Sequence, residues 1–138
     1  MQRVPVLACV ILALAAPVRA DTPSARPVMV GGDGEIDACP SLGEIVPLRK
    51  GGDGFVAVRA APSRRAREID RLKPGRALLL CEDSTDGQWV GVVYAEPWGG
   101  AVVEDCRVSS PVEGRPAAYD GPCLSGWVAR RYVMVTAG

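Results

Sequence analysis

Hydrophobic and polar residues alternate over several short stretches of the chain, which is the pattern of half-buried β-strands. In residues 55–59 Val56 and Val58 share one face, and Pro62 ends the strand because proline cannot donate to a ladder. Residues 77–82 and 88–94 form the clearest hairpin, since a five-residue link with a late glycine joins them. A first, partly irregular strand is expected within residues 38–48. The pattern predicts an all-β domain.

The inward positions of these strands define the expected hydrophobic core. Its members are Val56, Val58, Ile69, Leu72, Leu78, Leu80, Trp89, Val90, Val92, Val128 and Val133. The low aromatic content, 5%, together with 16 glycines and 12 prolines, agrees with short strands joined by tight turns. One small domain is the expectation.

Residues 1–20 have the layout of a secretory signal peptide. Arg3 supplies the positive start, residues 4–16 the apolar run, and Val18-Arg19-Ala20 the small-residue cleavage site, so cleavage is expected after Ala20. The apolar run is shorter than the roughly 20 residues that cross a bilayer, and no span is expected in the mature chain. Cys9 lies inside that run rather than after it, which disfavours a lipoprotein. The expected location is the periplasm or the exterior, with residues 21–37 as a flexible leader.

Four cysteines remain after residue 20, and an even number in a small exported domain predicts two disulfides. Three connectivities are possible. We favour Cys106–Cys123, which would close the long connection over residues 95–122, and Cys39–Cys81, which would fasten the first strand to the central hairpin. The chain has no C-x-x-C pair and no histidine, so the usual zinc spacings are missing.

The residue inventory argues against catalysis, cofactors and nucleic acid. Without histidine the Ser-His-Asp and Cys-His systems cannot be built. The chain has no P-loop, no G-x-G-x-x-G and no S-x-x-K. Residues 1–20 hold two of the 16 basic residues and none of the 16 acidic ones, so the remaining chain has a formal charge of −2. A nucleic-acid-binding domain usually has a basic stripe instead. We expect a protein that is not an enzyme and needs no cofactor or metal.

Three sequence motifs follow one another along the chain. They are V-x-V-R-x-x-P-S at residues 56–63, I-x-x-L-x-x-G at residues 69–75 and G-W-V-x-x-x-Y-V at residues 126–133. Over residues 54–136 the chain resembles the bacterial SH3 (SH3b) family. The resemblance implies a small SH3-like antiparallel β-barrel over residues 38–138, in which residues 63–70 form an excursion like the RT loop. Residues 95–122 depart from the family pattern as a long, disulfide-tied insertion before the last strand.

The resemblance also implies a function, because SH3b domains commonly serve as extracytoplasmic recognition units, often for cell-wall peptides. The chain is therefore expected to be an exported, non-catalytic binding module for a cell-wall peptide or a periplasmic protein. The alternative is a small, disulfide-stabilised periplasmic subunit or inhibitor with a structural or regulatory role. The oligomeric state stays open.

Candidate ligand-binding residues lie near the expected open surface of such a barrel. They are Arg64, Arg65 and Arg67 of the excursion, Tyr94 and Trp98. Trp98 lies between Pro97 and Gly99-Gly100, outside any strand, and an exposed tryptophan often contacts a partner. Trp98 could equally fold back over the barrel as a lid. Trp89, Trp127 and Tyr132 match the family pattern, and core packing is their more common role.

Overall fold

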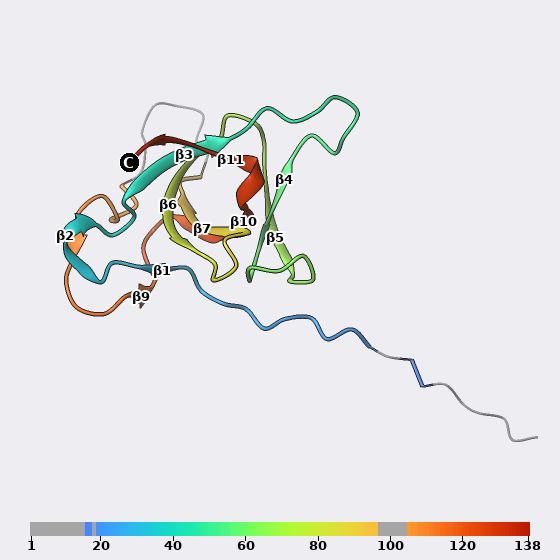
Figure 1. Cartoon of the computed structure of the whole chain (residues 1–138), viewed down its shortest axis with the longest axis horizontal. Coiled ribbons are helices and arrows are strands. Elements are labelled where there is room, and N and C mark those ends of the chain that lie inside the picture. Colours follow the sequence, from blue (N-terminus) through green and yellow to red (C-terminus); the bar gives the residue numbers. More distant parts are fainter. Residues whose placement is uncertain (1–15, 18, 97–104) are drawn as a thin grey trace, which may run out of the picture.

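The computed structural model describes residues 16–17, 19–96 and 105–138. Its centre is a seven-stranded antiparallel sheet with the order β11-β3-β6-β7-β10-β4-β5 (Figure 1). The strands are β3 (Ser41–Ile45), β4 (Val56–Arg59), β5 (Glu68–Leu72), β6 (Ala77–Asp83), β7 (Trp89–Tyr94), β10 (Leu124–Ala129) and β11 (Val133–Ala137). One turn of 3₁₀ helix, η1 (Arg130–Tyr132), joins β10 to β11. The described residues contain no α-helix, and the all-β prediction is confirmed.

The seven-stranded sheet is open where a closed barrel was expected. β11 and β5 stand at the two ends of the hydrogen-bonded order and do not pair with each other. β5 has the sequence Glu-Ile-Asp-Arg-Leu, and its charged residues Glu68 and Arg71 are exposed along that edge. Charged edge strands of this kind resist further pairing.

The predicted central hairpin is present, and its inward residues build the inner core. Strands β6 and β7 pair directly, with Leu80 opposite Val92. The inner cluster consists of Ile45, Val56, Val58, Leu72, Leu78, Leu80, Val90, Val92, Tyr94 and Val128. Val133 is half-buried and packs against this cluster. Most of the predicted core is therefore confirmed.

Ile69 is the member of the predicted core that the structure contradicts, because its side chain is 39% exposed. Val58 pairs with Asp70 and Arg59 with Glu68, so Ile69 is the extra residue of a β-bulge. The bulge lies on the edge strand β5, and no further strand of the described residues pairs beyond it to cover Ile69. The predicted excursion over residues 63–70 is also shorter than expected, since β5 begins at Glu68.

The outer face of the sheet is packed as well. Val93 belongs to a second cluster with Ala38, Cys39, Cys106 and Val108. A third cluster joins Trp89 and Trp127 to Val28 from the N-terminal segment. Trp89 thus lies in a core, as predicted, but on the outer side. All six residues of β7 are buried because both faces of the hairpin are covered.

The outer cover comes from the N-terminal segment and the insertion, and two small sheets join these two segments. β1 (Met29–Val30) pairs with β9 (Ala117–Ala118), and β2 (Asp33–Asp37) pairs with β8 (Pro111–Val112). Among the described residues, those from 19 to 25 lead away from the body as an extended chain (Figure 1, blue). The expected flexible leader over residues 21–37 therefore differs from the structure from Arg26 onward, because its apolar Val28 is buried.

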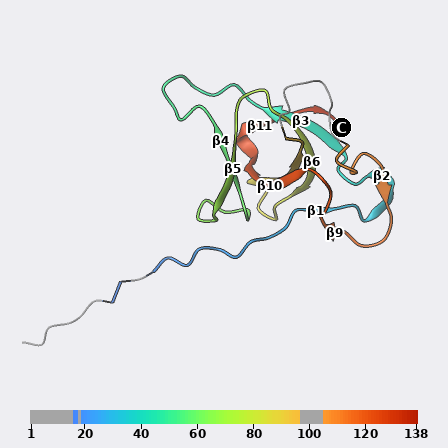
Figure 2. The same cartoon turned by 180° about the vertical axis from the view of Figure 1, so that it is seen from behind.

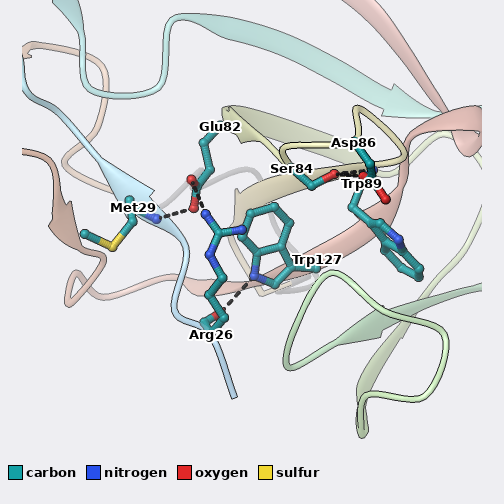
Figure 3. A network of polar contacts seen from close by, with 7 residues as sticks. All are labelled: Arg26, Met29, Glu82, Ser84, Asp86, Trp89 and Trp127. Atoms are coloured by element: carbon teal, nitrogen blue, oxygen red, sulfur yellow. Dashed lines mark hydrogen bonds and ion pairs between the residues drawn. The ribbon is translucent and has the colours of Figure 1, made fainter. Parts of the chain in front are cut away.

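A polar network fixes the N-terminal segment to the sheet (Figure 3). The indole Nε1–H of Trp127 donates to the carbonyl of Arg26 at 2.8 Å, and the guanidinium of Arg26 lies 4.5 Å from the Trp127 ring centroid. Glu82 accepts from Arg26 Nη2 at 3.0 Å and from the backbone N–H of Met29 at 2.8 Å. These contacts explain why Trp127 is fully buried on the outer face.

Both predicted disulfides are confirmed, as Cys39–Cys81 and Cys106–Cys123. The insertion lies between β7 and β10, so two strands follow it instead of one. The Tyr119 hydroxyl donates to the carbonyl of Cys106 and accepts from the N–H of Cys123, which ties the two arms of the insertion together. No helix in the described part of the chain is long and apolar enough to cross a membrane.

Candidate ligand-binding groove

A groove with a volume of about 790 Å³ lies at one end of the sheet. One wall is the long connection between β3 and β4, residues 46–55, which projects from the body in both views (Figures 1 and 2). The other wall is η1 with the adjoining ends of β7 and β10. The lining residues are Val46, Pro47, Leu48, Arg49, Gly51, Gly52, Asp53, Gly54, Phe55, Val56, Ala57, Arg59, Arg64, Glu68, Trp89, Ala129, Arg131 and Tyr132.

The local sequence explains the shape of the first wall. Gly51 and Gly54 have positive φ angles of 82° and 76°, a conformation that glycine adopts without strain. A Cβ atom at either position would meet nothing within 4 Å. Glycine is therefore needed here for the backbone conformation of the turn and not to make room for a neighbouring atom. The second Gly-Gly-Asp-Gly stretch of the chain thereby shapes the mouth of the groove.

Aromatic residues supply much of the groove's apolar surface. Trp89 opens β7, where its backbone N–H donates to the hydroxyl of Ser84 at 3.0 Å. Phe55 and Tyr132 are half-buried, and each has an arginine over its ring: Arg71 lies 4.2 Å from the Phe55 centroid and Arg131 4.6 Å from that of Tyr132. Cation–π contacts of this kind hold both partners in place.

Arginines dominate the charge of the groove. Four line it, Arg49, Arg59, Arg64 and Arg131, against the two carboxylates of Asp53 and Glu68. Glu68 is paired with Arg71, which leaves a local excess of positive charge. Arg59 donates to the carbonyl of Ala66 at 2.9 Å, and Arg131 donates to the Tyr132 hydroxyl at 3.1 Å. Arginine forks oriented in this way suit carboxylate or phosphate oxygens.

Of the ligand-binding residues that were predicted from the sequence and that the structure describes, only one is found in the lining of this groove. Arg64 lines it, whereas Arg65 and Arg67 are exposed on the same loop outside its lining. Tyr94 is buried in the inner core, where its hydroxyl donates to Asp70 at 2.8 Å. Trp98 lies outside the described residues, so neither of its two predicted roles is decided.

Sequence reasoning missed Arg49, Phe55 and Arg131. Arg131 falls within the G-W-V-x-x-x-Y-V stretch, where the position next to Tyr132 was the available signal. Arg49 stands just before a Gly-Gly-Asp-Gly turn, which marks an exposed loop but gives no hint of what faces it. The long-range approach of loop 46–55 to η1 is what brings these residues together.

The titratable groups whose pKa is shifted lie outside the groove. The described residues contain no group of three or more His, Cys, Asp or Glu side chains that could hold a metal ion. Burial, followed by the hydrogen bond to Asp70, raises the pKa of Tyr94, and hydrogen bonds from Ser84 and Gln88 lower the pKa of Asp86. Neither of these groups lines the groove. The four cysteines of the described residues form the two disulfides.

Comparisons of the chain with known protein families, with curated proteins and with solved structures found no match.

Proposed function

We propose that this chain is an exported, non-catalytic binding module with an SH3-like fold, and that its ligand occupies the groove between loop 46–55 and η1. The observation that carries the proposal is that apolar and aromatic residues line one groove together with four arginines. Concave sites with apolar walls and a few well-placed polar groups are the usual form of ligand sites, at about 300–1,000 Å³. A cell-wall peptide or a periplasmic protein is the ligand we favour.

Several features support the SH3-like assignment. The sheet contains two hairpins of consecutive strands, β4–β5 and β6–β7, and β7 is the middle strand of its order. A single 3₁₀ turn links the last two strands, and the stretch that carries it is the one that resembles the SH3b family. The two disulfides fit an oxidising compartment, which agrees with export.

The test is co-sedimentation of the mature chain with purified cell-wall sacculi, using a variant that fills the groove. Ala57 lines the groove, and on β4 it lies between Val56 and Val58, whose side chains face the inner core, so Ala57→Trp should block the groove without disturbing that core. Ala77→Trp is the matched control, because Ala77 is an exposed strand residue outside the groove lining. We expect wild type and Ala77→Trp to sediment and Ala57→Trp to stay in the supernatant. Equal sedimentation of the two variants would argue against the groove.

A second candidate function is a subunit that docks on a partner protein through β11. This edge strand exposes Met134 and Val135, and neighbouring β3 exposes Leu42. Such an edge is a ready template for pairing with another strand. Val135→Lys would then abolish capture of a periplasmic partner while Ala57→Trp leaves it unchanged, which is the reverse of the pattern expected for groove binding.

A further inference from the structure

The groove carries an excess of positive charge, although residues 21–138 as a whole have a slightly negative net charge. Residues 21–138 carry a formal charge of −2, yet four of their 14 basic residues line this one groove. Two acidic residues share the lining, and one of them, Glu68, is already paired with Arg71. Concave surfaces of one sign focus the local field and raise the concentration of ligands of opposite charge.

The arginines of the groove are placed to receive a ligand. Arg49 and Arg64 form no ion pair with any carboxylate in the described part of the chain. Arg131 is held against the ring and hydroxyl of Tyr132, which fixes its guanidinium without neutralising it. A fixed guanidinium loses less side-chain freedom when it binds an oxyanion.

The apolar surface of the groove indicates which class of anionic ligand it can bind. Pro47, Leu48 and Ala57 add apolar surface beside the arginines, which suits apolar side chains next to carboxylates. A single-stranded nucleic acid would need open aromatic faces for its bases. Here the rings of Phe55 and Tyr132 are each covered by an arginine, and Trp89 is only 8% exposed.

We propose that the groove recognises an acidic peptide, in which carboxylates are bound by Arg49, Arg64 and Arg131 and intervening apolar side chains pack on Pro47 and Leu48. This inference rests on the proposed function and adds the class of its ligand. The open groove beside β4 accommodates an extended segment, and bidentate arginine–carboxylate pairs give it both affinity and register.

The test titrates the ¹⁵N-labelled mature chain, with both disulfides intact, with three probes. The first is a blocked Leu-Glu-Leu-Glu-Leu peptide, the second its Gln isostere, and the third a single-stranded oligo-thymidine. We expect the acidic peptide to shift the Trp89 indole and the arginine Nε–H signals, and the Gln peptide to bind at least about tenfold more weakly. Equal affinity for the Gln peptide, or tighter binding of the oligonucleotide, would overturn the inference.

Neighbouring arginines provide a matched set of variants. Arg64→Gln and Arg131→Gln should each weaken the acidic peptide at least about fivefold, because each removes a charged hydrogen-bonding group. Arg65→Gln and Arg67→Gln remove the same charge from exposed positions outside the lining and should stay within about twofold. An equal loss of affinity in all four variants would mean that the peptide responds only to net charge, and it would contradict a specific site in the groove. The acidic peptide could fail to bind in the titration while Ala57→Trp still abolishes binding to sacculi. That result would refute the proposed ligand class, but it would leave the proposed function of the groove intact.

Discussion

Tyr94 is a phenol in the inner core whose partner is a carboxylate. Its side chain is 2% exposed, and its hydroxyl donates to Asp70 Oδ2 at 2.8 Å. Burial is the main cause that raises the pKa of this phenol, and the hydrogen bond to Asp70 and the charge of Asp70 act in the same direction. Ionisation of Tyr94 is therefore opposed in the folded state and unopposed in the unfolded chain.

This asymmetry predicts a loss of stability at alkaline pH. The contribution of Tyr94 is complete below pH 10, the ordinary tyrosine pKa, and is lost as the pH rises, because only the unfolded chain then releases the proton. By pH 11 the loss should reach about 1 kcal/mol of unfolding free energy. Urea unfolding at pH 8, 9.5 and 11 measures it. Tyr94→Phe should flatten the decline, and Asp70→Asn should reduce it only in part because burial remains. A Tyr94→Phe variant with the slope of wild type would contradict the assignment.

Gly126 shows how one residue sets the fit of two strands. A Cβ at this position would lie 2.4 Å from Val58 Cγ1 and 3.0 Å from Ile69 Cδ1, so β10 can approach β4 only without a side chain there. The glycine of the G-W-V stretch is thus a packing requirement, and the tryptophan after it is covered by the N-terminal segment.

At the scale of elements, the insertion and the N-terminal segment depend on one another. β8 and β9 belong to the insertion, yet their strand partners β2 and β1 come from residues 29–37. Two-residue strands have little stability of their own. The Cys106–Cys123 disulfide, with its separation of 17 residues, keeps the insertion's arms together.

Removing that disulfide should therefore loosen two distant segments together. For Cys106→Ser/Cys123→Ser we expect faster amide exchange in residues 26–37 and 106–123, and a loss of about 3 kcal/mol on the chain-entropy account. Exchange in β6 and β7 should change much less, because their ladder and inner core do not involve the insertion. Hydrogen exchange read by mass spectrometry measures both. Faster exchange confined to residues 106–123 would show that the N-terminal segment is held by Arg26 and Glu82 alone.

The elements that could be predicted from the sequence are those with local signals. β4, β6 and β7 follow from alternation, and the cystine pairs follow from the need to close the insertion and to fasten the first strand. β1, β2, β8 and β9 could not be predicted, because three of them have two residues each, β2 is exposed along its whole length, and their pairings are long-range. The same limit applies to the groove: Arg64 had a local signal, but its neighbours Arg49 and Arg131 meet it only through the fold.

At the scale of the whole molecule, hydrophobic side chains pack against both faces of the central hairpin. Val92 faces the inner core with Val58 and Leu80, whereas Val93 faces the outer cluster with Cys39 and Cys106. Both valines are 0% exposed. In a sheet with one solvated face, adjacent residues of a strand would differ sharply in burial.

These two adjacent valines report separately on the inner and the outer packing of β7. Val92→Ala and Val93→Ala should each lower the free energy of unfolding by about 2 kcal/mol, since each removes two buried methyl groups and leaves a cavity. Val135→Ala is the control, because Val135 on β11 is 48% exposed and its truncation should stay within about 0.5 kcal/mol. Urea unfolding followed by tryptophan fluorescence measures all three, and Trp89 and Trp127 report on the outer layer. A near-neutral Val93→Ala would mean that the N-terminal segment and the insertion do not cover the sheet in solution, and the outer layer would then have to be described as separable from the inner core.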